Sequence, residues 1–186
     1  MNRIDVMFQN LKSKGKKGLF PFIPAGYPDI RTTEKLIYRM VAEGADLIEI
    51  GVPFSDPIAD GPVIQEASHI ALINGVNLDK IFEMVEKIRQ TGVEIPLVLM
   101  SYFNPLLKFG LKDVAEKARI VGIDGFIVPD LLPFSNDDEE DFSMILKEKE
   151  LHQIFLASII TEDNRLEKIV KNTRGFLYLI SKLGVT

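Results

Sequence analysis

Short, almost continuous apolar runs alternate along the chain with stretches in which apolar residues recur every three or four positions. Such runs are typical of strands buried on both faces, and such stretches are typical of amphipathic helices. The expected strands cover residues 19–25, 47–50, 95–100, 125–128, 154–157 and 176–180. Six strands separated by helices at intervals of roughly 25 residues indicate an α/β fold with a parallel sheet.

Residues at the expected helix ends add detail to this pattern. Thr32 or Thr33 can cap the helix after the first strand, and Thr161 can cap the one after the fifth strand. Pro62 suits the first turn of the helix after the second strand. The acidic run at residues 137–141 favours a helix N-terminus through the helix dipole, and we prefer this interpretation to a metal site. Residues between 102 and 105 are expected to form a loop.

Six strands leave the architecture open. A closed (β/α)8 barrel needs two more strand–helix units and about 250 residues, whereas a doubly wound open sheet is complete at this length. The Gly-x-Gly-x-x-Gly turn of a dinucleotide-binding fold is absent after the first expected strand. The pattern alone therefore favours neither architecture. No boundary or repeat divides the chain, so a single domain over residues 1–186 is expected.

Composition narrows the functional classes. The 186 residues are 46% hydrophobic and 26% charged, as in ordinary globular proteins, and the net charge of -5 gives no electrostatic argument for nucleic-acid binding. The absence of cysteine excludes disulfides, thiolate metal sites and a cysteine nucleophile, and it fits a reducing cytoplasm. No secretory signal and no apolar run long enough to cross a bilayer is found. His69 and His152 lack ligand-spaced partners and are assigned no metal role.

A carboxylate interrupts the second apolar run. Because side chains alternate between the faces of a strand, Glu49 points away from the side that Ile48 and Ile50 share. If the isoleucines pack under helices, Glu49 faces a barrel interior near the carboxyl end of its strand, where barrel enzymes carry catalytic groups. Desolvation there would raise the pKa of Glu49 towards neutrality, which suits a proton-transferring acid. The alternative is a structural glutamate held by a buried Arg or Lys.

Two aspartates follow in a loop that contains three prolines. Several acidic groups beside a strand end suggest a reaction site, with Asp60 and Asp56 close to Glu49 in sequence. Each aspartate also has a structural alternative: Asp60 could be a helix N-cap, and Asp56 could make a turn. Tyr102 and Tyr178, at or near strand ends, are interpreted as packing residues rather than catalytic ones.

One segment of this region carries a family resemblance. Residues 49–62 (EIGVPFSDPIADGP) closely resemble the signature of the tryptophan synthase α chain family. Other strand-and-loop segments of that family are matched, in order, by residues 21–28 (PFIPAGYP), 99–105 (LMSYFNP), 124–131 (DGFIVPDL) and 178–186 (YLISKLGVT). A resemblance this long and in this order is highly specific.

The resemblance implies a TIM barrel that cleaves indole-3-glycerol phosphate to indole and glyceraldehyde 3-phosphate, a retro-aldol step of tryptophan biosynthesis without a cofactor. The family's general acid/base falls on Glu49, which would protonate the indole ring carbon and take the proton of the glycerol hydroxyl. The second carboxylate falls on Asp60, which would accept the indole N–H and stabilise charge. The residues that would contact the substrate are Phe22, Met100, Ile127 and Tyr178 in the indole pocket and Thr186 on a mobile loop above it.

A protein partner is also implied. The loops around Asp56 and around Asn104 and Pro105 would face a β chain, a pyridoxal-phosphate enzyme that receives the indole in a cytoplasmic α2β2 assembly. No nucleic-acid or membrane partner is expected.

Departures from the family pattern concern three places and the end of the chain. Residues 158–160 (SII) replace a small residue, Pro and Thr, and Leu132 and Leu183 also differ; we interpret these changes as tolerated drift. The family continues after Thr186 with two strand–helix units whose glycine-rich loops and helix N-terminus hold the substrate phosphate. The chain is therefore interpreted as C-terminally truncated, with six of the eight units. It is expected to bind phosphate poorly and to fold by dimerising or covering its sheet edges.

Two other functions are considered. A truncated barrel could act only as a binding or modulating partner of a β chain, without turning over substrate. A related phosphate-binding barrel enzyme could act on another sugar phosphate, but the resemblance at residues 49–62 argues against it.

Overall fold

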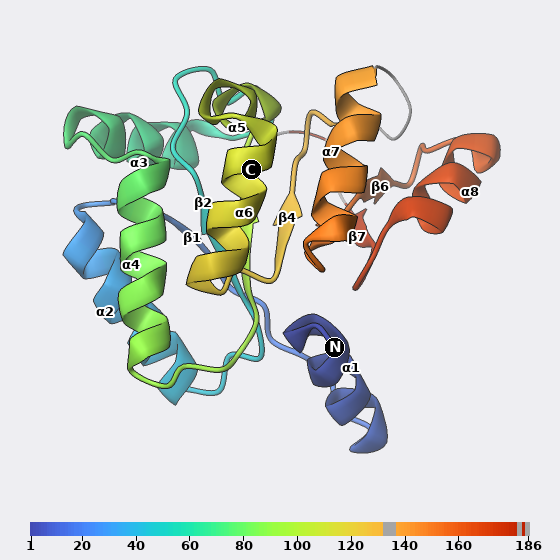
Figure 1. Ribbon diagram of the computed structural model, residues 1–186, viewed down its shortest axis with the longest axis horizontal. Helices are drawn as coiled ribbons and strands as arrows, with labels where there is room; N and C mark the ends of the chain where they lie inside the picture. Colours follow the sequence, from blue (N-terminus) through green and yellow to red (C-terminus); the bar gives the residue numbers. More distant parts are fainter. Residues whose placement is uncertain (132–136, 182–183, 185–186) are drawn as a thin grey trace.

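The computed structural model describes residues 1–131, 137–181 and 184, with the backbone alone for residues 137–141 (Figure 1). All paired strands are parallel. The strands are β1 (Phe22–Pro24), β2 (Ile48–Gly51), β3 (Leu97–Met100), β4 (Gly125–Ile127), β5 (His152–Ile154), β6 (Leu156–Ser158) and β7 (Tyr178–Ile180). The helices are α1 (Arg3–Ser13), α2 (Ile30–Ala42), α3 (Pro62–Ile73), α4 (Leu78–Gln90), α5 (Phe103–Phe109), α6 (Leu111–Val121), α7 (Asp137–Glu148) and α8 (Asp163–Asn172).

Strand order decides between the two architectures that the sequence left open. The main sheet has the order β1-β2-β3-β4-β5, and β6 pairs with β7 in a second sheet. The order thus follows the chain without reversal, whereas a doubly wound sheet changes direction part-way. The fold is therefore the singly wound α/β arrangement of a TIM barrel, as far as the described strands extend.

The fifth expected strand is two strands in the structure. Residues 154–157 were expected to form one strand because their apolar run is continuous, but Phe155 separates β5 from β6. The carbonyl of Phe155 accepts a hydrogen bond from Tyr178 N at 3.0 Å, while Ile154 still pairs with Ile127 of β4. The chain thus changes neighbours at Phe155, from β4 on one side to β7 on the other.

Three expectations about the helices are wrong in detail. Asp29, not Thr32 or Thr33, is the N-cap of α2, and its carboxylate accepts a hydrogen bond from Thr32 N at 2.8 Å. Glu162 precedes α8, while the Thr161 hydroxyl instead accepts a hydrogen bond from Ser158 N. The expected loop at residues 102–105 opens helix α5. Pro62 does begin α3, and the acidic run 137–141 does open α7.

The two faces of the sheet have separate apolar cores. On the outer face, Ile48 and Ile50 are fully buried beneath α2, α4, α6 and α7, which follow one another around the sheet (Figure 1). On the inner face, Leu47, Val98 and Ile127 form a second cluster with residues of α1. The alternation predicted for β2 is therefore confirmed. No helix among the described residues has the length and apolar character to cross a membrane.

Helix α1 lies at the amino ends of the strands. Its Phe8 packs edge-on against Phe20, just before β1, and both rings contact Phe176, just before β7, with centroid separations of 5.7 to 5.8 Å. These three rings, called the phenylalanine triad below, join the first and last described strands. The triad therefore closes this end of the structure although β1 and β7 do not pair.

A buried ion-pair network lies at the same end. Asp124, immediately before β4, is 3% exposed. Its carboxylate accepts hydrogen bonds from Arg89 Nη2 at 2.8 Å, Arg3 Nη1 at 3.1 Å and Leu97 N at 2.9 Å. The Arg89 guanidinium also donates to the carbonyls of Gly122, Val93 and Ile95. This network fixes α1 and α4 to the starts of β3 and β4.

Candidate active site

Glu49 is the most deeply buried acidic group at the carboxyl end of the described sheet. Its side chain is on the inner face of β2 and the residue is only 4% exposed. Among the described residues, none donates a hydrogen bond to its carboxylate, and no Arg or Lys pairs with it. Burial raises the pKa of Glu49 from 4.5 to about 7. The alternative of a structural glutamate held by a buried cation therefore does not apply to the part of the chain that the structure describes.

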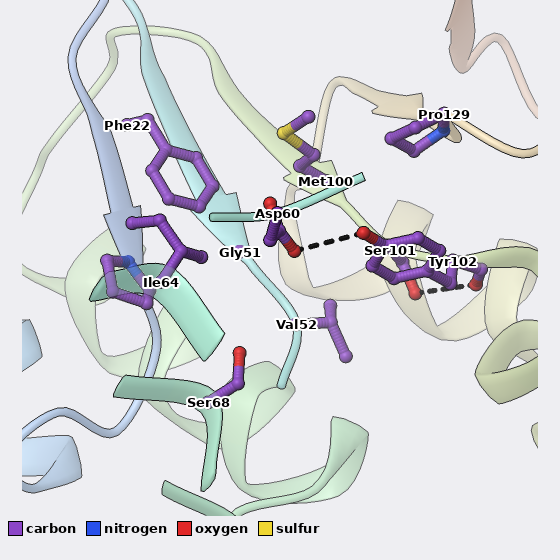
Figure 2. Close-up of a pocket in the computed structure, with 11 residues that line it drawn as sticks. Phe22, Gly51, Val52, Asp60, Ile64, Ser68, Met100, Ser101, Tyr102 and Pro129 are labelled. Carbon is purple, nitrogen blue, oxygen red and sulfur yellow. Dashed lines mark hydrogen bonds between the residues drawn. The ribbon is translucent and has the colours of Figure 1, made fainter. Parts of the chain in front are cut away.

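A narrow cavity lies on the same face of β2, beyond Glu49 toward the carboxyl end of the strand. Gly51 shares the face of Glu49, two residues on, and lines this cavity. A Cβ atom on Gly51 would come within 2.6 Å of the Phe22 ring, so the glycine lets that ring lie across β2 (Figure 2). Phe22 is also the register partner of Glu49 across the β1–β2 pair. Glu49 is not itself a lining residue, but its neighbour on the same face, Gly51, and its register partner, Phe22, both line the cavity.

The cavity wall is largely apolar with few polar groups, as in many small-molecule sites. Figure 2 shows the Phe22 ring, the Met100 thioether and the Asp60 carboxylate turned toward one space. The lining residues are Phe22, Pro24, Gly51, Val52, Asp60, Ile64, Ser68, Met100, Ser101, Tyr102 and Pro129. They come from the ends of β1 to β3, the start of α3 and the segment after β4.

Asp60 contributes the carboxylate of this wall. The N-cap of α3 is Gly61, so the interpretation of Asp60 as a helix N-cap is wrong. Its Oδ2 instead accepts a hydrogen bond from the Tyr102 hydroxyl at 3.0 Å. Burial raises the pKa of Asp60, and the Tyr102 hydrogen bond opposes that rise. Asp60 is thus an acceptor with one oxygen already oriented.

The other residues expected at the site fall into two groups. Ile127 and Tyr178 lie in the inner cluster with Met100, and Ile127 is the register partner of Met100. Burial raises the pKa of the Tyr178 phenol, and the Glu49 carboxylate raises it further, which indicates that the two side chains are near each other. Thr186 lies outside the described residues.

The residues expected to contact a partner lie on the surface at the same end. Asp56 and Asn104 are exposed and Pro105 is half-buried. The Ser55 hydroxyl donates a hydrogen bond to the Asp56 carboxylate. Ile58 N donates to the Asp56 carbonyl at 2.9 Å, consistent with the turn that was the structural alternative for Asp56. Ile58 and Val63, in and just after the same loop, are 77% and 75% exposed.

Tyr102 is a residue of the candidate site that was not expected there from the sequence. It was interpreted as packing, yet its hydroxyl contacts both Asp60 and the backbone of Ala59. The available signal was its position directly after the third strand, because the carboxyl ends of neighbouring parallel strands meet at one edge. Within the described residues, no cluster of three or more His, Asp or Glu side chains could hold a metal ion.

Comparisons with known proteins agree with this geometry. The family model "Tryptophan synthase alpha chain" matches residues 8–186. The tryptophan synthase alpha chain of Clostridium acetobutylicum is 43% identical over 185 residues, and that of Nitrosomonas europaea is 43% identical over 186 residues. The chain belongs to the tryptophan synthase α chain family. Proteins of this family are lyases of tryptophan biosynthesis with a TIM-barrel fold.

Solved structures of the family match almost the whole chain. The tryptophan synthase subunit alpha of Legionella pneumophila superposes with a TM-score of 0.93 at 40% identity, covering 97% of this chain and 68% of that one. A structure of Mycobacterium tuberculosis tryptophan synthase gives 0.92 at 34% identity, covering 100% of this chain and 70% of that one. The curated relatives are likewise covered over 68% and 66% of their length. The chain therefore spans about two thirds of the proteins it resembles.

Proposed function

We propose that this chain catalyses the cleavage of indole-3-glycerol phosphate to indole and glyceraldehyde 3-phosphate, without a cofactor. The observation that carries the proposal is the Glu49 carboxyl group. It is buried close to a cavity with aromatic residues in its wall, and no Arg or Lys among the described residues pairs with it. With a pKa of about 7, this group is populated in both protonation states near neutral pH. Such a group can donate and accept a proton within one catalytic cycle.

In the proposed mechanism Glu49 moves two protons. Its neutral form gives a proton to the ring carbon of the indole that carries the glycerol chain. Its ionised form takes the proton of the neighbouring glycerol hydroxyl as the carbon–carbon bond breaks and the hydroxyl becomes the aldehyde. The second transfer restores the neutral acid, so no cofactor or net proton is consumed.

Asp60 is proposed to act as the fixed acceptor. As the ring carbon is protonated, positive charge develops on the indole nitrogen. A carboxylate that accepts the indole N–H stabilises this charge at the place where it forms. The apolar wall of Phe22 and Met100 suits the flat indole ring, and Ile127 and Tyr178, which belong to the same inner cluster as Met100, are proposed to extend that wall. Thr186 is proposed to lie on a loop over the bound substrate.

We also propose a tryptophan synthase β chain as the protein partner. The surface with Asp56, Asn104 and Pro105 lies at the same end of the structure as the cavity, so a partner there could receive indole over a short path. The exposed Ile58 and Val63 offer apolar area that a partner would cover. A charged substitution at Ile58 is a direct test of this surface, with β-chain binding as the measurement.

The decisive experiment measures indole release from indole-3-glycerol phosphate by the chain, alone and with an added β chain. Replacing Glu49 by Gln keeps the shape and removes the titrating group, so the rate should fall about 10³-fold. The variant must give the same circular dichroism spectrum as the parent chain. Undiminished indole release by E49Q would exclude Glu49 as the acid/base. Absence of indole from the parent chain under both conditions would exclude the proposed activity for this chain.

A further inference from the structure

Tyr102 links the proposed reaction site to the rigid part of the sheet. Its hydroxyl oxygen lies 3.0 Å from Asp60 Oδ2 (Figure 2). The same oxygen lies 2.9 Å from Ala59 N. Both partners belong to the loop between β2 and α3, whereas Tyr102 follows β3 and precedes α5. One phenol therefore joins the ends of two neighbouring strands at the point where the second proposed catalytic carboxylate lies.

The phenol ring is itself held firmly. Tyr102 is 5% exposed, and its ring packs against Phe54 with centroids 5.3 Å apart. Its carbonyl accepts a hydrogen bond from the Ser101 hydroxyl at 2.9 Å. The next backbone amide, Phe103 N, donates to the Asp130 carboxylate at 2.9 Å, which fixes the start of α5. The Tyr102 ring and the backbone next to it are therefore both held in place, which fixes the position of the hydroxyl.

The two contacts give the hydroxyl a direction. A phenol has one proton to donate, and the backbone N–H of Ala59 can only be a donor toward its oxygen. The proton is therefore available for Asp60, whose ionised form is an acceptor only. Burial raises the pKa of Tyr102 to about 12, so the hydroxyl keeps its proton throughout the neutral range.

The hydrogen bond acts on the carboxylate and not merely on the loop. The backbone of Asp60 has separate anchors, because its carbonyl accepts from Gln65 Nε2 at 2.8 Å and its N–H donates to the Pro57 carbonyl at 3.0 Å. Loss of the phenol hydroxyl would remove the acceptor of the Ala59 N–H but leave these two contacts of the Asp60 backbone in place. At Asp60 itself it would change the orientation and the proton affinity of the side chain.

We propose that Tyr102 is a positioning residue, whose hydroxyl holds one oxygen of ionised Asp60 and so leaves the other oxygen aimed at the N–H of the bound indole ring. The effect of this positioning on catalysis rests on the proposed function. The positioning itself can be measured without turnover, so the two can fail separately.

The primary test is the titration of Asp60 by ¹³C NMR of aspartate-labelled protein, with the Asp60 signal identified by its loss in D60N. The Tyr102→Phe variant keeps the ring and removes the donor. The pKa of Asp60 should then rise, because the Tyr102 hydrogen bond lowers it in the parent chain. The matched control is Tyr38→Phe, which removes a tyrosine hydroxyl that donates to the Glu34 carboxylate on α2, away from the site. An unchanged Asp60 titration in Y102F would overturn the proposal.

A second measurement covers the case in which Y102F folds poorly. Replacing the four tyrosines by 3-fluorotyrosine keeps every ring but makes each phenol a stronger hydrogen-bond donor. The pKa of Asp60 should fall relative to the unlabelled protein. A rise or no change would overturn the proposal even if Y102F cannot be prepared.

Steady-state kinetics of indole release test the catalytic part of the proposal. In Y102F the kcat for indole release should fall about tenfold with KM changed less than about threefold, because the interaction matters most once charge develops on the ring. The acid limb of the pH–rate profile should move to higher pH, since activity requires ionised Asp60. A tenfold loss without any movement of that limb would indicate a merely structural role. No activity in the parent chain, with the NMR shift present, would reject the proposed function and leave the positioning intact.

Discussion

Two buried carboxylates at opposite ends of the same sheet differ in almost everything except burial. Asp124, at the amino end, is 3% exposed, and two arginines and a backbone amide donate to it. Glu49, toward the carboxyl end, is 4% exposed, and no donor to its carboxylate is found among the described residues. Burial costs both groups and raises the pKa of both, but only at Asp124 do hydrogen-bonded partners offset part of that cost. Asp124 therefore has a role in holding the fold together. Glu49 lacks such partners and has a pKa of about 7, which suits proton transfer.

The largest effect is expected from removing the charge of Asp124. In D124N, Arg89 and Arg3 lose their shared counter-ion while Arg89 stays largely buried, which should lower the free energy of unfolding by about 4 kcal/mol. Urea denaturation at pH 7 measures this. A change below about 1 kcal/mol would mean that the ion pairs of Asp124 do not stabilise the fold in the way this comparison assumes.

A somewhat smaller effect of opposite sign is expected at Glu49. A carboxyl group whose folded pKa is raised from 4.5 to about 7 is neutral in both states at low pH, and its penalty grows as pH rises through that interval. The E49Q variant should therefore gain stability relative to the parent chain, by about 3 kcal/mol more at pH 8.5 than at pH 4, using 1.36 kcal/mol per pKa unit. Urea denaturation at the two pH values measures the difference. A pH-independent difference would contradict the raised pKa.

The Glu49 half of this contrast can be predicted from sequence, whereas the arginines around Asp124 are not indicated by any pattern in the chain. The alternation around Glu49 predicted its face, which the structure confirms, and the position near a strand end predicted a proton-transfer role, which stays a prediction. Tyr102 could not be assigned in the same way, because its contact with Asp60 joins residues 42 apart and depends on how a proline-containing loop folds. The break at Phe155 was also hidden, since an apolar run does not indicate where a strand changes neighbours. The pattern likewise gave no hint that Asp29 would cap α2 before either threonine.

A third prediction tests the shape of the cavity beside Glu49. A methyl group at Gly51 would meet the Phe22 ring at 2.6 Å, so G51A should displace the ring and lower stability by about 2 kcal/mol. Binding of indole, measured by equilibrium dialysis, should weaken in parallel. Adding Phe22→Leu to G51A should restore part of the stability, because the clashing ring is then absent. Strict additivity of the two substitutions would argue against this contact.

The smallest effect provides a reference for surface charge. Glu43 pairs with Arg39 on α2, with the two side chains 62% and 75% exposed. Because solvent screens such pairs, E43Q should change the free energy of unfolding by less than about 0.5 kcal/mol. Urea denaturation of E43Q and D124N under the same conditions measures the two changes. A loss of stability in E43Q close to that in D124N would mean that burial is not what distinguishes these carboxylates.

The phenylalanine triad has a consequence for how the molecule is made. Phe8 emerges from the ribosome early, but its partner Phe176 belongs to the last described strand segment. The apolar face of α1 can pack on Phe20, Leu47 and Val98 earlier, but the triad itself is complete only after Phe176 has been synthesised. The contact between residues 8 and 176 is therefore a long-range one, and the order of translation makes its formation a late step of folding.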